Sequence, residues 1–325
     1  MLTVTHCLAL ALATLSLVSC KDSASSTAAA TVSNKSPLAT EASAKKIASN
    51  AYQHTEKILS FGHRQPESAG LKKSKDYVIA QLKRSNWSCI EQRFTAKTPK
   101  GLVEYSNLIA RYAPNSNNPW RRSVKGVLGA HIDSKILPNF LGADDAASCV
   151  AAILAIANHL DQTAPHAAQQ LELVLFDGEE AIRSSMTTRD GLYGSIHYSR
   201  MVQAATAQQA VPYKKTPEFG VVLDMIGHHN LDIKIPADTP KMLARSYFAA
   251  VKKLGHEKHF GKSRGSFLDD HYPMNVIAKI PTIDIIGDFS SNKWWHTSAD
   301  SIDLISEESL SMSIQVALEI ISNQL

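Results

Sequence analysis

The chain has 325 residues, of which 44% are hydrophobic and 20% are charged, and its formal net charge is +4. This composition is ordinary for a globular protein, and the length allows one large α/β domain or two small ones. No block of Lys and Arg stands beside interleaved aromatic residues, as a nucleic-acid groove requires. We therefore expect no nucleic-acid partner.

Residues 1–20 have the pattern of an export signal. The run CLALALATLSLVSC ends in small residues and is too short for a comfortable membrane span. Its last four residues, Leu17 to Cys20, resemble the bacterial lipobox, in which the cysteine is acylated and becomes the first mature residue. The resemblance implies an exported lipoprotein bound to a bacterial membrane only through lipid on Cys20. Lys21 suggests the outer membrane or a periplasm-facing position, and an ordinary cleaved signal peptide is the alternative.

Residues 21–40 are rich in Ser, Ala and Thr and show no apolar periodicity, so they predict a flexible tether. No second domain boundary follows, which leaves residues 41–325 as a single domain. The spacing of Cys89 and Cys149 does not decide whether they form a disulfide. Cys149 lies in the apolar run CVAAILAIA, which favours a buried free thiol.

The pattern of apolar residues predicts the order of helices and strands. A period of three to four residues at 43–61 and 72–87 predicts two amphipathic helices, and strand-like runs follow at 107–112 and 124–130. Helices are then expected at 145–160, 191–204, 240–254 and 307–322, alternating with strands at 171–176, 219–223 and 281–286. Such alternation predicts an α/β fold with a mixed, mostly parallel open sheet and helices on both faces.

Acidic and histidine side chains follow the ends of the predicted strands. They are His131 and Asp133, Glu179 and Glu180, Asp224, and His296. Ligands of open α/β sheets bind beyond the carboxyl ends of strands, so these side chains are expected to converge. Asp, Glu and His without thiolates are the ligand set of a catalytic zinc that keeps one position open. The alternative for the paired glutamates is a solvated helix start, where the dipole favours acids.

Glu179 and Glu180 are adjacent at a strand end, so their side chains point in different directions. One can therefore bind a metal while its neighbour faces the substrate as a general acid or base. A nearby cation would remove much of their mutual repulsion.

Seven motifs occur in the order found in the zinc aminopeptidase superfamily, namely HIDSK, FLGADDAASCVAAIL, LVLFDGEEA, DGLYGS, VVLDMIG, DDHYP and WWHTSADSID. Over residues 41–325 they look most like its glutaminyl cyclase branch, the animal-type glutaminyl-peptide cyclotransferases. GADD and GEEA are shared with the aminopeptidases. Lys135 in HIDSK, the spelling FDGEEA and the motif DDHYP favour the cyclase.

The resemblance implies one zinc per chain, held by Asp145, Glu180 and His296, with Glu179 as the proton shuttle. The implied reaction cyclises the N-terminal glutamine of a peptide or protein to pyroglutamate and releases ammonia. The alternative for Asp145 is an acid at a helix start, and the alternative for His296 is a packed core residue beside aromatics.

The resemblance also assigns residues around this centre. Asp224 and Asp269 match acids near the substrate amine, although Asp269 also suits an Asx turn. Trp295 matches an indole of the substrate pocket, although an aromatic beside a ligand is often only packing. His131 and Asp133 match residues near the metal, and in the aminopeptidases the equivalents of His131 and Asp224 complete a second zinc site.

One position departs from the animal cyclases, which carry a pocket tryptophan after FDGEEA where this chain has Ser185. Met186 or Phe289 is expected to supply that part of the substrate pocket. Two alternatives to the cyclase remain: a two-zinc aminopeptidase that hydrolyses N-terminal residues, and a catalytically inactive peptide-binding lipoprotein. The intact DGEE and WWHT segments conflict with the second. The sequence does not predict an oligomeric state.

Overall fold

The computed structural model of the protein describes residues 37–115, 118–290 and 293–325. The predicted export signal, the lipidation at Cys20 and residues 21–36 of the predicted tether lie outside this part of the chain. The first element of the described part is α1, which begins at Glu41 with a capping box formed by Thr40 and Ser43. Among the helices described, none is both long enough and apolar enough to cross a bilayer.

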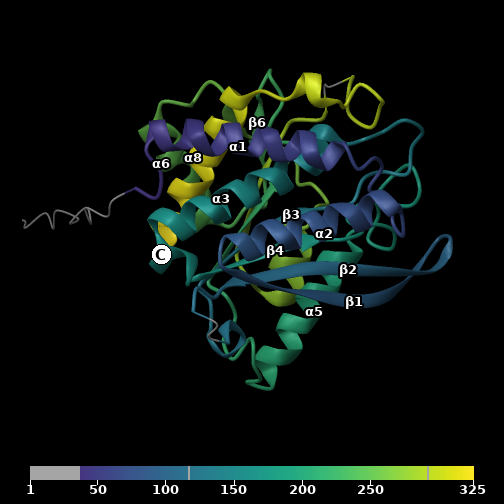
Figure 1. The fold of residues 1–325 in the computed structure, drawn as a ribbon, viewed down its shortest axis with the longest axis horizontal. Helices are drawn as coiled ribbons and strands as arrows, with labels where there is room; N and C mark the ends of the chain where they lie inside the picture. The colour runs from purple at the N-terminus through teal and green to yellow at the C-terminus, as the bar shows by residue number, and fades with distance from the viewer. Residues whose placement is uncertain (1–36, 116–117, 291–292) are drawn as a thin grey trace, which may run out of the picture. The chain divides into compact units, whose positions relative to one another are not determined.

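A six-stranded sheet in the order β1-β2-β4-β3-β5-β8 lies at the centre of the fold (Figure 1). Four parallel strands form most of it, namely β3 (Gly126–His131), β4 (Leu171–Phe176), β5 (Phe219–Asp224) and β8 (Thr282–Ile286). The hairpin of β1 (Trp87–Thr98) and β2 (Gly101–Tyr112) adds antiparallel strands at one edge. The predicted mixed, mostly parallel sheet is therefore confirmed. A separate small sheet pairs β6 (Ile233–Ile235) with β7 (Phe260–Lys262).

Helices cover both faces of the large sheet (Figure 1). One face packs against α1 (Glu41–Leu59), α2 (Ala69–Arg84), α3 (Cys149–Thr163), α6 (Lys241–Leu254) and α8 (Glu307–Gln324). The other face packs against α5 (Tyr193–Ala207) and a π-helix at Met274–Ala278, which follows the short helix α7 (His271–Pro273). Other short helical segments are Pro119–Arg121, α4 (Pro165–Ala168) and Ile302–Leu304.

The core is divided into two layers by the sheet. Along β5, Val221 and Leu223 belong to the layer under α1, α3 and α8, whereas Val222 belongs to the layer under α5. This alternation follows from the two-residue period of a strand. Each of the strands β3, β4 and β5 has six residues, and all of them are buried. This burial explains why the strands appear in the sequence as continuous apolar runs.

A buried ion pair joins the antiparallel hairpin to the parallel strands. Arg111 Nε on β2 lies 2.6 Å from Glu172 Oε2 on β4, and both side chains are fully buried. The hydroxyls of Tyr198 and Tyr213 each donate to Glu172 Oε1 at 2.7 Å. Each oxygen of the carboxylate therefore has a partner, which is the condition under which a charged group is tolerated in a core.

Two predicted helix boundaries were wrong, and one strand was not predicted. The helix expected at 72–87 ends at Arg84, because Asn86 has a positive φ of 59° and Trp87 begins β1. That strand was missed because most of its residues are partly or fully exposed. The helix expected from residue 145 begins as a π-helix at Ala143–Ser148 and becomes regular only at Cys149. Cys89 and Cys149 are both free thiols, and Cys149 is buried as predicted.

Candidate active site and metal centre

Neighbouring parallel strands bring most of the predicted site residues to one edge of the sheet. β3 ends at His131 and β5 ends at Asp224, while Glu179 and Glu180 follow the end of β4. Since β4, β3 and β5 are adjacent and parallel, these ends lie side by side. The convergence predicted from the sequence therefore occurs.

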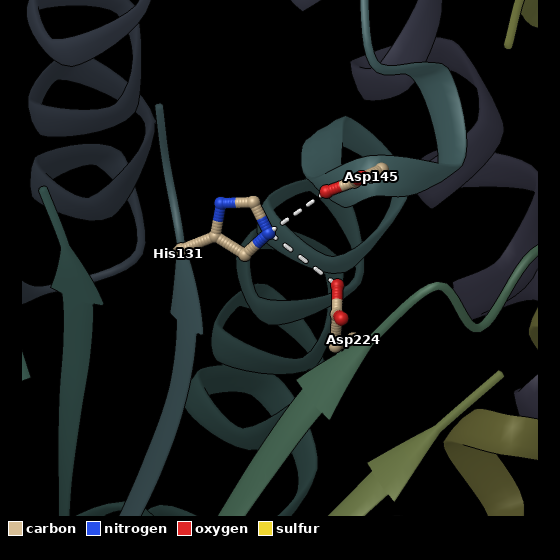
Figure 2. A group of neighbouring side chains, drawn as sticks. All are labelled: His131, Asp145 and Asp224. Atoms are coloured by element: carbon tan, nitrogen blue, oxygen red, sulfur yellow. Dashed lines mark ion pairs between the residues drawn. The ribbon is translucent and has the colours of Figure 1, made fainter. Parts of the chain in front are cut away.

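Figure 2 shows one of the two groups of ligating side chains that share Asp145. It is formed by His131, Asp145 and Asp224. His131 Nε2 lies 3.1 Å from Asp145 Oδ1 and 3.4 Å from Asp224 Oδ1. The two carboxylates approach the same ring nitrogen from different segments of the chain (Figure 2). Asp145 lies in the irregular π-helical turn before α3, where its φ of −105° and ψ of 84° are not helical.

The second group consists of Asp145, Glu180 and His296. His296 Nε2 lies 3.3 Å from Asp145 Oδ2 and 3.3 Å from Glu180 Oε1. Asp145 therefore turns one carboxylate oxygen toward each group. In each group the three donor atoms lie within 4.8 Å of one another.

The chemistry of these groups fits a zinc ion. Adjacent ligands of a tetrahedral zinc with bonds of about 2.0–2.1 Å lie about 3.3 Å apart, which matches the His–carboxylate distances. Glu180 Oε1 and Asp224 Oδ1 are buried and have no hydrogen-bond partner among the described residues. Burial alone would raise the pKa of Asp145, but its hydrogen bonds to His131 and His296 outweigh that effect and lower the pKa. An ionised Asp145 is the form that binds a cation.

Two buried aspartates hold the site loops through backbone hydrogen bonds. Asp133 accepts from the N–H groups of Glu179 at 3.1 Å and Glu180 at 3.2 Å. Asp300 accepts in the same way from Asp144 at 2.8 Å and Asp145 at 3.2 Å. The structure thus places Asp133 behind the ligating groups, where it fixes the backbone of both glutamates.

Arg64 is a further positioning residue, which sequence reasoning missed. Its buried guanidinium donates to the carbonyls of Ile132 at 3.0 Å, Leu141 at 2.6 Å and Gly142 at 2.9 Å. These carbonyls belong to the segments on either side of residues 133–140, between β3 and the turn that holds Asp145. Arg64 therefore fixes the distance between two parts of the centre.

A cavity of about 420 Å³ opens beside the second ligating group. Its lining includes Glu179, Glu180, Asp224, Asp269, Phe289 and Trp295, which the sequence assigned to catalysis, zinc binding or substrate binding. Trp295 stacks on His296 with ring centroids 3.9 Å apart, and Phe289 lies 4.8 Å from Trp295.

The cavity wall contains Ser185 and Met186, as expected, together with Phe267, which sequence reasoning missed. Phe267 packs edge-on against Phe289 with ring centroids 5.3 Å apart. An aromatic surface therefore lines the cavity on the side of Phe289, although this chain lacks the expected family tryptophan.

Glu179 differs from Glu180 in its surroundings. It belongs to neither ligating group, whereas Glu180 Oε2 lies 3.1 Å from Lys135 Nζ and Glu180 Oε1 belongs to the second group. Burial raises the pKa of Glu179 well above its ordinary value, and the charges of Glu180 and Asp269 add to the effect. A buried carboxyl with a raised pKa, facing a cavity, suits proton transfer.

Comparisons with known proteins agree with this arrangement. A bovine glutaminyl-peptide cyclotransferase-like protein is 28% identical over 265 residues, which cover 73% of this chain and 66% of that protein. The chain thus spans just under two thirds of that relative's length. The structure of a glutaminyl cyclase from an Acidobacteriales bacterium matches with a TM-score of 0.73 and 29% identity, over 90% of this chain and 97% of that one.

A structure titled leucine aminopeptidase precursor, from Bacteroides thetaiotaomicron, has the same TM-score of 0.73 with 26% identity, over 85% of this chain and 97% of that one. The fold is therefore shared by proteins with both names. The model of peptidase family M28 matches residues 107–321. This match covers more than half of the sequence and includes both ligating groups, so the chain belongs to peptidase family M28.

Proposed function

We propose that the protein is a zinc-dependent glutaminyl-peptide cyclotransferase. It would convert the N-terminal glutamine of peptides or proteins to pyroglutamate and release ammonia. One observation carries the proposal: Glu179 is a buried carboxyl that faces the same cavity as Asp145, Glu180 and His296 but belongs to neither ligating group. The similarity to proteins named glutaminyl cyclase supports it.

In this proposal Asp145, Glu180 and His296 hold one zinc, which when bound would polarise the γ-carbonyl of the substrate glutamine as a Lewis acid. The substrate's α-amine attacks the carbonyl carbon of its own γ-amide, a ring C–N bond forms, the amide C–N bond breaks, and ammonia leaves. Glu179 accepts the proton from the amine and returns it to the departing nitrogen.

The cavity walls hold the substrate for this attack. Trp295 and Phe289 offer flat apolar surfaces on which a bent glutamine side chain can pack, with its amine directed to Asp224 and Asp269. Holding the two reacting atoms of one molecule close together is the main requirement, because an intramolecular attack needs no activated water. Lys135, 3.1 Å from Glu180, orients that glutamate.

The group of His131, Asp145 and Asp224 favours a second candidate, a two-zinc aminopeptidase. Two groups that share Asp145 would hold two ions close together, as in two-metal hydrolases. The two candidates share a fold, so only the reaction distinguishes them.

Incubation with two kinds of peptide tests the proposed reaction. A Gln-initiated peptide should lose one ammonia and keep all its residues, because the ring closes within the first residue. Leu- and Ala-initiated peptides should remain unchanged, since they lack a γ-amide within reach of the amine. Mass spectrometry of both reactions measures the outcome. Release of free leucine, with the Gln peptide uncyclised, would instead identify an aminopeptidase.

The zinc ligands are tested by metal analysis of folded variants. Asp145→Ala, Glu180→Ala and His296→Ala should each lose about one zinc per chain. A catalytic zinc has only three protein ligands, so two remaining ligands would not hold it. Ser185→Ala, which changes the cavity wall but no ligand, should keep the full zinc content. If one of the three alanine variants retains all its zinc, the residue that it replaces is not a zinc ligand.

The role of Glu179 is tested by Glu179→Gln, which keeps the shape of the side chain but removes the proton acceptor. Turnover of a Gln-initiated peptide should fall by at least roughly a hundredfold while the zinc content stays unchanged. Measuring the zinc content of the same variant distinguishes proton transfer by Glu179 from zinc binding by Glu180. Loss of zinc from Glu179→Gln would show that their roles are reversed.

We also propose that residues 1–20 direct export and that lipid on Cys20 anchors the enzyme, with residues 21–40 as a tether for the domain at 41–325. The motif at residues 17–20 supports this proposal. Full-length protein should partition with membranes and Cys20→Ala should not, because acylation requires the thiol. An intact mass that corresponds to an unmodified first residue would contradict the proposal.

A further inference from the structure

A third group of ligating side chains shares no residue with the two described above, and it consists of Asp269, His271 and Asp284. Asp284 occupies the middle of β8 and is paired in register with Val222 of β5. His271 begins α7, and Asp269 lies two residues before it. All three side chains are buried, with exposed fractions of 3% or less.

The atoms of this group converge on one point. His271 Nδ1 lies 3.2 Å from Asp284 Oδ2, and the three donor atoms lie within 4.8 Å of one another. This spacing matches the 3.1–3.4 Å between histidine and carboxylate atoms in the active site. It also matches the distance of about 3.3 Å expected between adjacent ligands of a tetrahedral zinc.

The polar atoms of His271 and Asp284 have few hydrogen-bond partners. Within the described part of the chain, neither ring nitrogen of His271 has a hydrogen-bond partner, and no N–H donor reaches Asp284, whose carboxyl approaches that of Asp269. The close contact of Nδ1 with Asp284 therefore lacks the alignment of an N–H donor with its acceptor. The two active-site groups also contain buried oxygens without a hydrogen-bond partner among the described residues, namely Glu180 Oε1 and Asp224 Oδ1.

The group is acidic and deeply buried, and burial raises the pKa of Asp269 and Asp284 well above the ordinary value. No lysine or arginine among the described residues forms an ion pair with Asp269 or Asp284, and His271 is the basic side chain in contact with them. Asp284 projects from β8 toward the apolar layer that contains Val222 and Met274. Buried carboxylates in such surroundings require a cation or a shared proton.

We propose that Asp269, His271 and Asp284 bind a divalent metal ion in addition to the zinc of the active site. An imidazole with two carboxylates suits zinc and related transition metals, whereas magnesium and calcium prefer oxygen ligands alone. Asp269 Oδ1 accepts the backbone N–H of Asp270, which leaves the other oxygen available for the ion.

The ion would connect the cavity to the sheet behind it. Asp269 lines the cavity, whereas Asp284 belongs to β8 and His271 to α7. An ion bound by all three would fix the Asp269 carboxylate relative to the strand, so its role is structural and does not depend on which reaction the enzyme catalyses. The site would hold its ion whether the protein is a cyclase or a peptidase.

Zinc counting in the full-length chain tests the proposal. Wild-type protein and variants are loaded with zinc, freed of excess by gel filtration, checked for folding by circular dichroism, and analysed for zinc and protein. Asp284→Asn and His271→Phe, which keep approximate shape, should each lose about one zinc per chain. His296→Ala, which removes an active-site ligand, should retain this ion, and adding Asp284→Asn to it should remove the ion.

Asp76→Asn is the matched control, because it makes the same chemical change at an exposed aspartate of α2, outside the group, and should keep all its zinc. Zinc content equal to wild type in both Asp284→Asn and His271→Phe would overturn the proposal in favour of a shared proton or a plain His–Asp contact. Anomalous diffraction from zinc-loaded wild-type crystals decides the matter without any variant. A peak between Asp269, His271 and Asp284 supports the proposal, and its absence overturns it.

Discussion

The burial of several carboxylates at and beside the ends of the parallel strands is the constraint on which the rest of the site depends. Asp145, Glu180 and Asp224 have exposed fractions of 7% or less. Buried anions are stable only with partners, and His131 and His296 approach all three. Glu180 Oε1 and Asp224 Oδ1 lack hydrogen-bond partners among the described residues and belong to the two ligating groups, so a cation bound there would complete the arrangement.

Backbone hydrogen bonds set the geometry of these carboxylates. Asp133 binds the consecutive N–H groups of Glu179 and Glu180, and Asp300 does the same for the turn that carries Asp145. Because the backbone of both glutamates is fixed on one side, their side chains diverge on the other. Glu180 enters a ligating group, whereas Glu179 lines the cavity outside both groups, which explains why two acids that repel each other stand side by side.

The sequence predicted what depends on local patterns and missed what depends on distant contacts. The parallel strands were predicted because burial on both faces produces continuous apolar runs, and the polar residues after them indicated the site. β1 was missed because most of its residues are at least partly exposed, so its sequence does not alternate regularly between apolar and polar residues. Arg64 was missed because its partners lie about 70 residues away along the chain. Asp284 stands inside the apolar run TIDII, where only the fold reveals its neighbours.

The proposed cyclisation depends on the cavity more than on the ligating groups. His131 Nε2, placed between Asp145 and Asp224, can bind a second ion or donate an N–H to either carboxylate. The same three side chains therefore suit both a one-metal and a two-metal enzyme. Cyclisation differs in requiring a glutamine side chain to fold back on its own amine. Under the proposed function, a cavity with Trp295 and Phe289 in its walls and Glu179 among its lining residues would provide a surface for the bent side chain and a base for the amine.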